Sequence, residues 1–244
     1  MPILMYDLAG AEDERRISPF CWRVRLALAH KDLPVETRPW RMVEKDAIDA
    51  AGVTTVPVIV DNGRAIGDSW VIADYLEQAY PDRPALFAGP QSRALTKMTH
   101  HWTEQLHRLL VPLILREVLA HIDERDSLYF RSSRERAFGK PLEAVIDESP
   151  AAFQRFDGAL SPLRRLLRES PYLCGSAPAY ADYIVFGMFQ WARACSTHVL
   201  TRGDDDPVRA WLGRIAGLYG GLAASAPGYV SWSPKPPMQA GSVS

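Results

Sequence analysis

The chain has 244 residues, which accommodates one or two domains, and 47% of them are hydrophobic, enough for a sizeable core. Its 28 basic and 29 acidic residues nearly cancel, which argues against nucleic-acid or membrane-surface binding driven by net charge. The 3 cysteines are too few for a disulfide framework. No run of residues is apolar enough to span a bilayer, and no signal peptide is visible. We therefore expect a cytoplasmic protein.

The first 80 or so residues alternate strand and helix patterns. In chain order we expect a strand at 3–8, a helix at 18–30, a strand at 34–40, a weaker helix at 41–51, strands at 56–60 and 64–66, and a helix at 70–80. Asp61, Asn62 and Gly63 form the turn between the last two strands. This β-α-β-α-β-β-α order predicts a parallel pair with a right-handed crossover, joined to an antiparallel hairpin in one small mixed sheet.

The second half of the chain is predicted to be all helical. The segment PDRPALFAGP is typical of a linker, and strand patterns nearly vanish after it. Helices are expected at 92–121, 143–168, 181–196 and 207–223. Residues 123–140, dense in charges of both signs, are predicted to form a solvated segment or a mobile crossing. We therefore expect domains at 1–80 and 92–230, a linker at 81–91 and a mobile tail at 231–244.

Three local patterns can carry chemistry, although each has a simpler structural explanation. Ser18 opens a helix as its N-cap, where backbone N–H groups and the helix dipole stabilise an anion such as a thiolate; a plain cap is the simpler explanation. Val56-Pro57 places a proline in a strand pattern, which implies an edge, a bulge or a special bond. Asp68 and Ser69 open another helix, and they either hold a zwitterionic amino-acid head or only cap the helix.

Together with the element order, these patterns resemble a soluble glutathione S-transferase. That family has an N-terminal thioredoxin-like domain followed by an all-α domain. The resemblance covers nearly the whole chain and is carried by SPFCWRVRLAL, VPVIVDNG, DSWVIADYLEQAYPDRPALF and AYADY. It implies glutathione as co-substrate, an electrophilic small molecule as second substrate and a homodimer, with no metal, nucleic acid or membrane partner.

The resemblance also implies roles for individual residues. Ser18 would donate a hydrogen bond to the glutathione thiolate and lower its pKa. The backbone of Val56, which precedes what would be a cis-Pro57, would pair with the cysteinyl segment of glutathione. Asp68 and Ser69 would hold the γ-glutamyl head, with Asp68 standing where many members have a glutamate.

Two parts of the substrate site are less strongly patterned. Arg41 or Lys45 would meet the glycyl carboxylate of glutathione. The second substrate would lie between the domains, and aromatic or apolar residues at helical spacing are candidates for its wall, although such residues more often form core. These candidates are Trp22, Trp102, Leu106, Phe130, Phe189 and Trp191.

Within the family, the chain looks most like a bacterial branch that includes the β-aryl-ether-cleaving enzymes. The likeness is carried by ISPFCWRVRLALAHK, DSWVIADYLEQAYPDRPALF and DDPVRAWLGR. It implies attack by the glutathione thiolate on the carbon that bears an aryl ether. One departure from the family pattern is Ala179, where Ser or Thr is usual, so Asp182 alone is expected to reach back to a backbone N–H.

Three other interpretations were weighed. A ligandin-like protein would bind glutathione or aromatic ligands without turnover. A thiol oxidoreductase working through Cys21 is disfavoured because Ser18 replaces the exposed attacking cysteine. His100, Glu104 and His107 share a helix face, but the second half of a di-metal motif is missing, so no metal is expected.

Overall fold

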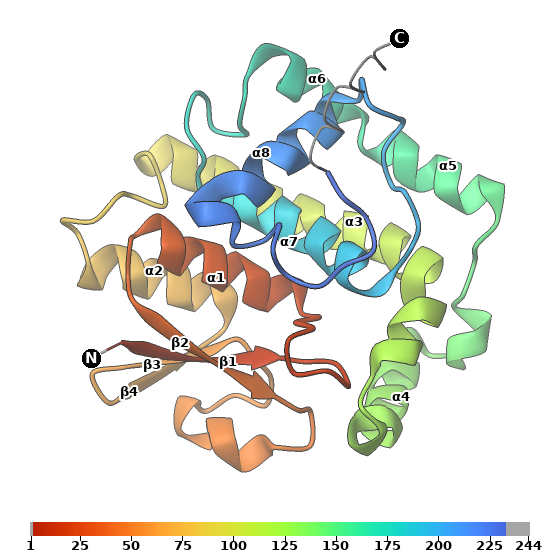
Figure 1. Cartoon of the computed structure of the whole chain (residues 1–244), viewed down its shortest axis with the longest axis horizontal. Coiled ribbons are helices and arrows are strands. Elements are labelled where there is room, and N and C mark those ends of the chain that lie inside the picture. The colour runs from red at the N-terminus through yellow and green to blue at the C-terminus, as the bar shows by residue number, and fades with distance from the viewer. Residues whose placement is uncertain (1, 233–244) are drawn as a thin grey trace, which may run out of the picture.

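The computed structural model describes residues 2–232, which begin with a four-stranded sheet. The strands β1 (Ile3–Leu8), β2 (Val35–Trp40), β3 (Val58–Asp61) and β4 (Arg64–Gly67) lie in the order β2-β1-β3-β4. β1 is parallel to β2 and antiparallel to β3, which forms a hairpin with β4. The helices α1 (Pro19–His30) and α2 (Ser69–Ala79) lie on one face of the sheet (Figure 1). This is the mixed sheet and the element order that the sequence predicts.

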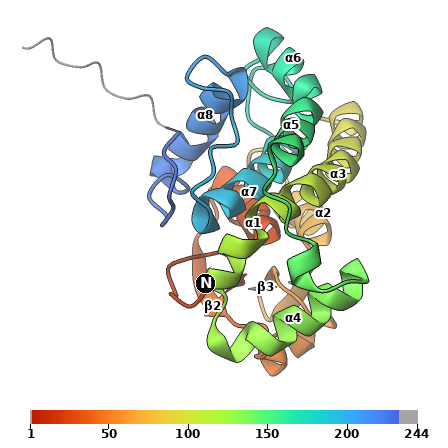
Figure 2. The same cartoon turned by 90° about the vertical axis from the view of Figure 1, so that its right-hand side faces the viewer.

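The rest of the described chain is all helical, as predicted. Its elements are α3 (Pro90–His121), α4 (Glu124–Phe138), the short 3-10 helix η2 (Leu142–Ala144), α5 (Pro150–Ala159), α6 (Ser161–Glu169), α7 (Tyr180–Cys195) and α8 (Pro207–Gly221). Nowhere in residues 2–232 is a helix both long and apolar enough to traverse a bilayer. α7 is apolar around nearly its whole circumference, and it forms the centre of the helical domain against α1 and α3 (Figures 1 and 2).

Several helix boundaries differ from the expected ones for local reasons. α3 begins at Pro90 rather than Ser92, because Gly89 at φ 97° is its N-cap and Pro90 fits the first turn. The single helix expected at 143–168 is broken into η2, α5 and α6, because Pro150 and Pro162 lie in the first turns of α5 and α6, where proline starts a new helix. The helix expected at 41–51 starts only at Lys45 and is the 3-10 helix η1 (Lys45–Ala51).

The charged segment at 123–140 forms a helix, α4, which the sequence analysis did not expect, although most of its side chains are exposed, as in a solvated segment. Asp123 Oδ1 accepts a hydrogen bond from Arg125 N at 2.9 Å and so caps its first turn. Gly139, at φ 68°, takes the left-handed conformation that ends it. Because its charges lie mainly on the outer face, the helix keeps an apolar stripe for packing.

The end of the described chain is packed rather than free. Trp232, within the tail expected to be mobile, is buried, and its ring lies 5.4 Å from that of Phe186 on α7. The remainder of that expected tail, 233–244, lies outside the described residues.

The two halves of the molecule meet where α7 crosses α1. At Gly187, an added Cβ would lie 2.4 Å from the carbonyl oxygen of Pro19, so the two backbones are in direct contact. Only glycine permits this approach. The contact fixes the first turn of α1, and with it Ser18, against the helical domain.

Candidate functional site

Ser18 is the N-cap of α1, as the sequence predicts. Its backbone is extended, at φ −98° and ψ 122°, and its Oγ accepts a hydrogen bond from Cys21 N at 3.1 Å. Pro19 follows at the first helical position. Although Ser18 is nearly buried, it lines a large cavity, so its O–H can donate to an anion there.

The Val56-Pro57 peptide bond is cis. Val56 lies two residues before β3 and lines the same cavity as Ser18. The bond foreseen from the family resemblance is therefore present in the structure.

Asp68 and Ser69 begin α2 and lie outside the lining of the large cavity. Oδ1 of Asp68 accepts hydrogen bonds from Trp70 N at 2.8 Å and Val71 N at 3.0 Å. The carbonyl of Ser69 accepts a hydrogen bond at 2.5 Å from the hydroxyl of Tyr180, at the start of α7. Both residues thus have structural partners, and the helical domain holds the first turn of α2 in place.

Arg41 and Lys45, the two candidates for the glycyl carboxylate, have different environments. Arg41 is buried and its guanidinium already bonds Asp13 at 2.6 Å and Asp123 at 3.2 Å. Lys45 has no carboxylate partner among residues 2–232; its Nζ donates to the Thr54 carbonyl at 2.7 Å and lines the cavity. Lys45 is consequently the better placed of the two to meet an anion.

The cavity has a volume of about 490 Å³ and lies between the two domains. One wall comes from the first turn of α1 and from residues around Lys45 and Val56, and the other comes from α3, α4 and Trp191 of α7. This volume is in the range of small-molecule sites. Its lining is largely apolar and aromatic and includes Phe20, Trp40, Tyr129, Phe130, Phe138 and Trp191.

Only Phe130 and Trp191 of the six candidate wall residues line this cavity. Trp22 and Leu106 are fully buried elsewhere, and Trp22 Nε1 donates to the Arg16 carbonyl at 3.0 Å. Trp102 is half-buried and packs against the core.

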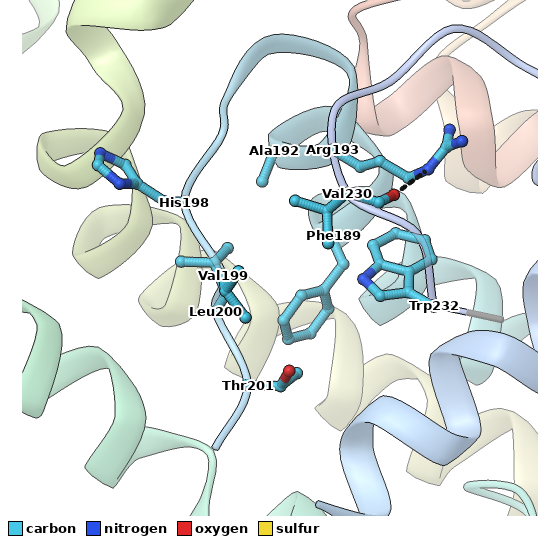
Figure 3. A pocket seen from close by; sticks show the side chains of 9 residues that line it. All are labelled: Phe189, Ala192, Arg193, His198, Val199, Leu200, Thr201, Val230 and Trp232. Atoms are coloured by element: carbon cyan, nitrogen blue, oxygen red, sulfur yellow. Dashed lines mark hydrogen bonds between the residues drawn. The ribbon is translucent and has the colours of Figure 1, made fainter. Parts of the chain in front are cut away.

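Phe189 lies on the other side of α7 from Trp191, because residues two apart on a helix point in nearly opposite directions. It faces a separate, small pocket beside Leu200 and Trp232 (Figure 3). In that pocket Arg193 Nε donates to the Val230 carbonyl at 2.8 Å and holds the end of the described chain. The sequence gives the spacing of such residues but not the side of the helix that faces the cavity.

Among the cavity residues that the sequence analysis did not find are two sets of polar side chains and their neighbours. The first is the inner face of α4, including Tyr129, Ser133 and Arg134, because the segment was not expected to be a helix. Asp123 as a cap and Gly139 as a terminator were the available signals. The second is His107, considered only as a metal ligand.

His107 contacts the rings of Phe20 and Trp191, with centroids 5.7 and 6.2 Å away. Burial, and then the charge of Arg23, lower its pKa to about 3. The imidazole is therefore neutral at physiological pH and adds polar character without charge to the cavity wall.

Cys21 is completely buried, which argues against its use as a redox thiol. Burial raises the pKa of the Cys21 thiol well above its usual value, and the nearby carboxylate of Asp7 raises it further. Because the thiolate is the reactive form, this environment suppresses thiol exchange.

The possible metal ligands on α3 are arranged differently from the expected set. His100 Nε2 and His101 Nδ1 lie 3.5 and 3.6 Å from the carboxylate of Glu104, whereas His107 turns toward the cavity. Arg23 Nη1 donates to His100 Nδ1 at 3.4 Å, which leaves the proton of the neutral ring on Nε2. That tautomer opposes metal ligation through His100.

Comparisons with known proteins agree with this architecture. The model of the glutathione S-transferase N-terminal domain matches residues 14–84, and that of the C-terminal domain matches residues 94–216. The chain belongs to the glutathione S-transferase family. This confirms the family resemblance and the fold, but neither match distinguishes a branch within the family.

Individual relatives are distant. A glutathione S-transferase-like protein, ustS, of Aspergillus flavus is 30% identical over 146 residues, which is 52% of this chain and 50% of that protein. The chain thus spans about half the length of this curated relative. A probable glutathione S-transferase, parC, of Nicotiana tabacum is 24% identical over 186 residues, covering 74% of this chain and 72% of the relative.

Solved structures show the same fold over nearly the whole chain. A glutathione transferase of Phanerochaete chrysosporium, GSTFuA2, has a TM-score of 0.71 at 27% identity and covers 92% of this chain and 94% of its own. A glutathione S-transferase of Ceriporiopsis subvermispora, solved in complex with glutathione, has a TM-score of 0.77 at 24% identity and covers 93% of this chain and 99% of its own.

Proposed function

We propose that this glutathione S-transferase family member is a glutathione transferase that uses Ser18 to stabilise the thiolate. The observation that carries the proposal is the position of Ser18. Its hydroxyl lies at the N-terminus of α1 and at the wall of an aromatic cavity of about 490 Å³. A thiolate beside Ser18 gains the helix dipole and one donated hydrogen bond, and it faces the space where an apolar acceptor fits.

The rest of glutathione would extend from Ser18 in two directions. The backbone of Val56 would pair with the cysteinyl segment, and Asp68 and Ser69 would hold the γ-glutamyl head. Lys45, rather than the doubly paired Arg41, would bind the glycyl carboxylate. These assignments are supported by the family resemblance and by the lack of a carboxylate partner for Lys45 within residues 2–232.

In the reaction, the thiol proton leaves to solvent and the sulfur of the thiolate attacks the electrophilic carbon. A carbon–sulfur bond forms with the sulfur electron pair, and the bond to the leaving group breaks with its own pair. The chain supplies a stabilised nucleophile and a largely aromatic wall that orients the acceptor. We include β-aryl ethers among the acceptors, for which the leaving group is a phenolate that takes a proton from solvent.

The test is Ser18→Ala, with Ser133→Ala as the matched control. Ser133 also lines the cavity, but from α4. We expect wild-type protein to lower the apparent thiol pKa of bound glutathione, measured by thiolate absorbance. Ser18→Ala should lose most of that pKa shift. Its kcat/KM should fall by only on the order of tenfold, because the backbone N–H groups at the start of α1 remain. An unshifted thiol pKa in the wild type would refute the proposal.

A panel of aryl halides, epoxides and β-aryl ethers separates transfer from binding alone. Product formation with any of these acceptors supports a transferase. Tight binding of glutathione and aromatic ligands without product would instead support the ligandin-like alternative. Phenol release from the ethers is the specific signal for ether cleavage.

We also propose a homodimer of two-domain subunits. Exposed apolar side chains on α2 and α3, Val71, Leu95 and Met98, support a subunit contact there. Light scattering of the purified chain should give twice the mass of the monomer; a monomer would exclude this assembly.

A further inference from the structure

The charge of the large cavity is one-sided. Among its lining residues, all within 2–232, Lys45 and Arg134 carry positive charge, and none is Asp or Glu. The remaining lining is apolar, aromatic or neutral polar. An apolar wall weakens the screening of such charges, so the cavity attracts anions more strongly than the near-neutral chain as a whole.

Lys45 has local partners that fix its position. Its Nζ donates to the Thr54 carbonyl at 2.7 Å and to the Tyr129 hydroxyl at 3.2 Å. The ammonium also lies 5.0 Å from the centre of the Trp40 ring. In the proposed function, this ammonium binds the glycyl carboxylate of glutathione.

Arg134 has no such partner. Within residues 2–232 its guanidinium makes no ion pair and no hydrogen bond, and its carbon lies 5.4 Å from the centre of the Phe130 ring. Arg131, one turn earlier on α4, pairs with both Glu135 and Glu143 at 2.9 Å. Carboxylates are thus available around α4, yet the arginine that faces the cavity has none.

We infer that the second substrate is an aromatic molecule bearing an anionic group, such as a carboxylate, that pairs with Arg134. This inference rests on the proposed function and names the class of its acceptor. The aromatic body packs against Phe130 and Trp191, both in the cavity wall, while the anion reaches the open guanidinium on α4. A planar guanidinium can bind a carboxylate through two parallel hydrogen bonds.

The inference changes the order of preference among acceptors. A purely apolar acceptor uses only the aromatic wall. An acceptor with a carboxylate remote from the reacting carbon uses the wall and Arg134 together. A cationic acceptor is disfavoured by both charges of the lining.

A matched pair of substrates tests this preference. The acceptors are a chlorodinitrobenzoate and the isosteric chlorodinitrobenzamide, whose reacting carbon and leaving chloride are the same. Each kcat/KM is divided by the rate constant of the uncatalysed reaction with glutathione, which removes the difference in intrinsic reactivity. We expect the wild type to prefer the benzoate by about fivefold after this correction.

Three variants assign the preference to a residue. Arg134→Gln should abolish it, and Arg134→Lys should retain part of it. Arg136→Gln is the matched control, because it removes the same charge from the same helix at a position outside the cavity lining. An equal effect of Arg134→Gln and Arg136→Gln, or no preference in the wild type, would overturn the inference.

A binding measurement separates this inference from the proposed function. Calorimetry with naphthoate and naphthamide, at saturating glutathione, requires no turnover. Tighter binding of naphthoate that disappears in Arg134→Gln supports the anion site even if no acceptor is converted, in which case the transferase proposal alone fails. Equal binding of the two ligands refutes the anion site even if transfer occurs.

Discussion

At the scale of single residues, Asp182 shows how one carboxylate replaces a missing cap. Ala179 has no side-chain acceptor for the first turn of α7, and Asp182 Oδ2 accepts the Ala179 N–H at 3.0 Å, as the sequence predicts. Its Oδ1 accepts hydrogen bonds from Leu173 N at 3.0 Å and Trp211 Nε1 at 2.9 Å. Complete burial nevertheless raises the pKa of Asp182 to about 6, and the three donors only offset it in part.

The raised pKa fixes the sign of a pH dependence. Between the ordinary value of 3.8 and about 6, the folded chain holds this proton more tightly than the unfolded chain. The contribution to stability is therefore complete below pH 3.8 and is lost as the pH rises to about 6, by about 3 kcal/mol in total. Removing a hydrogen-bond donor to Asp182 should thus lower the free energy of unfolding more at high pH, where the carboxylate is ionised, than at low pH.

Trp211→Phe removes such a donor from the buried carboxylate. We expect its cost in free energy of unfolding to be about 1.5 kcal/mol larger at pH 8 than at pH 5, because only the ionised form needs the donor strongly. Urea unfolding at both pH values measures this. Trp22→Phe is the control, since Trp22 is equally buried but donates to a backbone carbonyl. A pH-dependent cost of the same size in Trp22→Phe would contradict the explanation.

At the scale of elements, the sequence predicts those whose patterns are local. The sheet, α1 and α2 follow from apolar periodicity, caps and turns, and the structure has them nearly as expected. α4 was missed because its stability depends on distant partners. The carboxylate of Asp126 on α4 accepts hydrogen bonds from Met42 N at 2.8 Å and Val43 N at 3.0 Å, more than 80 residues away in sequence. A charge-rich pattern does not reveal such pairing, so Phe130 is the one residue of the α4 wall of the cavity that the sequence analysis names.

The crossing of α1 and α7 gives an element-scale prediction. Gly187→Ala would place a methyl group 2.4 Å from the Pro19 carbonyl oxygen, and both partners are backbone, so the helices must separate. We expect a loss of about 1–3 kcal/mol in the free energy of unfolding, as for overpacked cores. Because Ser18 immediately precedes Pro19, kcat/KM with glutathione should fall as well.

Gly158→Ala on α5 is the control, because nothing lies within 4 Å of the added methyl group. It should leave activity unchanged and leave stability equal or slightly higher, since alanine favours a helix over glycine. Equal stability and activity of wild type and Gly187→Ala would mean that the crossing is not as close as described.

At the scale of the whole molecule, a partly buried polar cluster joins the two domains. His30 at the end of α1 donates from Nε2 to the Ala85 carbonyl of the connecting segment, at 3.0 Å. Its Nδ1 must therefore accept, and the hydroxyl of Tyr183, at 2.6 Å, is its donor. The hydroxyl of Tyr219 lies 3.1 Å from the same nitrogen and gives its one proton to the Tyr183 oxygen. Helices from both domains and the connecting segment thus share one hydrogen-bonded network.

Protonation of His30 would disrupt this network, because Nδ1 could then no longer accept a hydrogen bond. Burial is the main cause that lowers its pKa below the usual 6.5, and the charge of Lys31 lowers it further. The unfolded chain therefore binds this proton more readily, and the stability that His30 contributes is present above pH 6.5 and is lost as the pH falls below it.

Tyr183→Phe removes a hydroxyl that donates to the neutral imidazole. We expect the free energy of unfolding to fall by about 1–2 kcal/mol at pH 8, the usual range for one or two buried hydrogen bonds. The loss should be smaller at pH 5.5, because the variant favours the neutral ring less and its His30 pKa moves back toward the ordinary value. Urea unfolding at the two pH values measures both effects.

Tyr172→Phe is the matched control for this change. Tyr172 is half-buried in the helical domain, and its hydroxyl makes no hydrogen bond within residues 2–232. Its replacement should cost little and to the same extent at either pH. A cost of Tyr183→Phe that grows as the pH falls would mean that the tyrosine accepts from a protonated His30, and the direction of the interdomain network would have to be reversed.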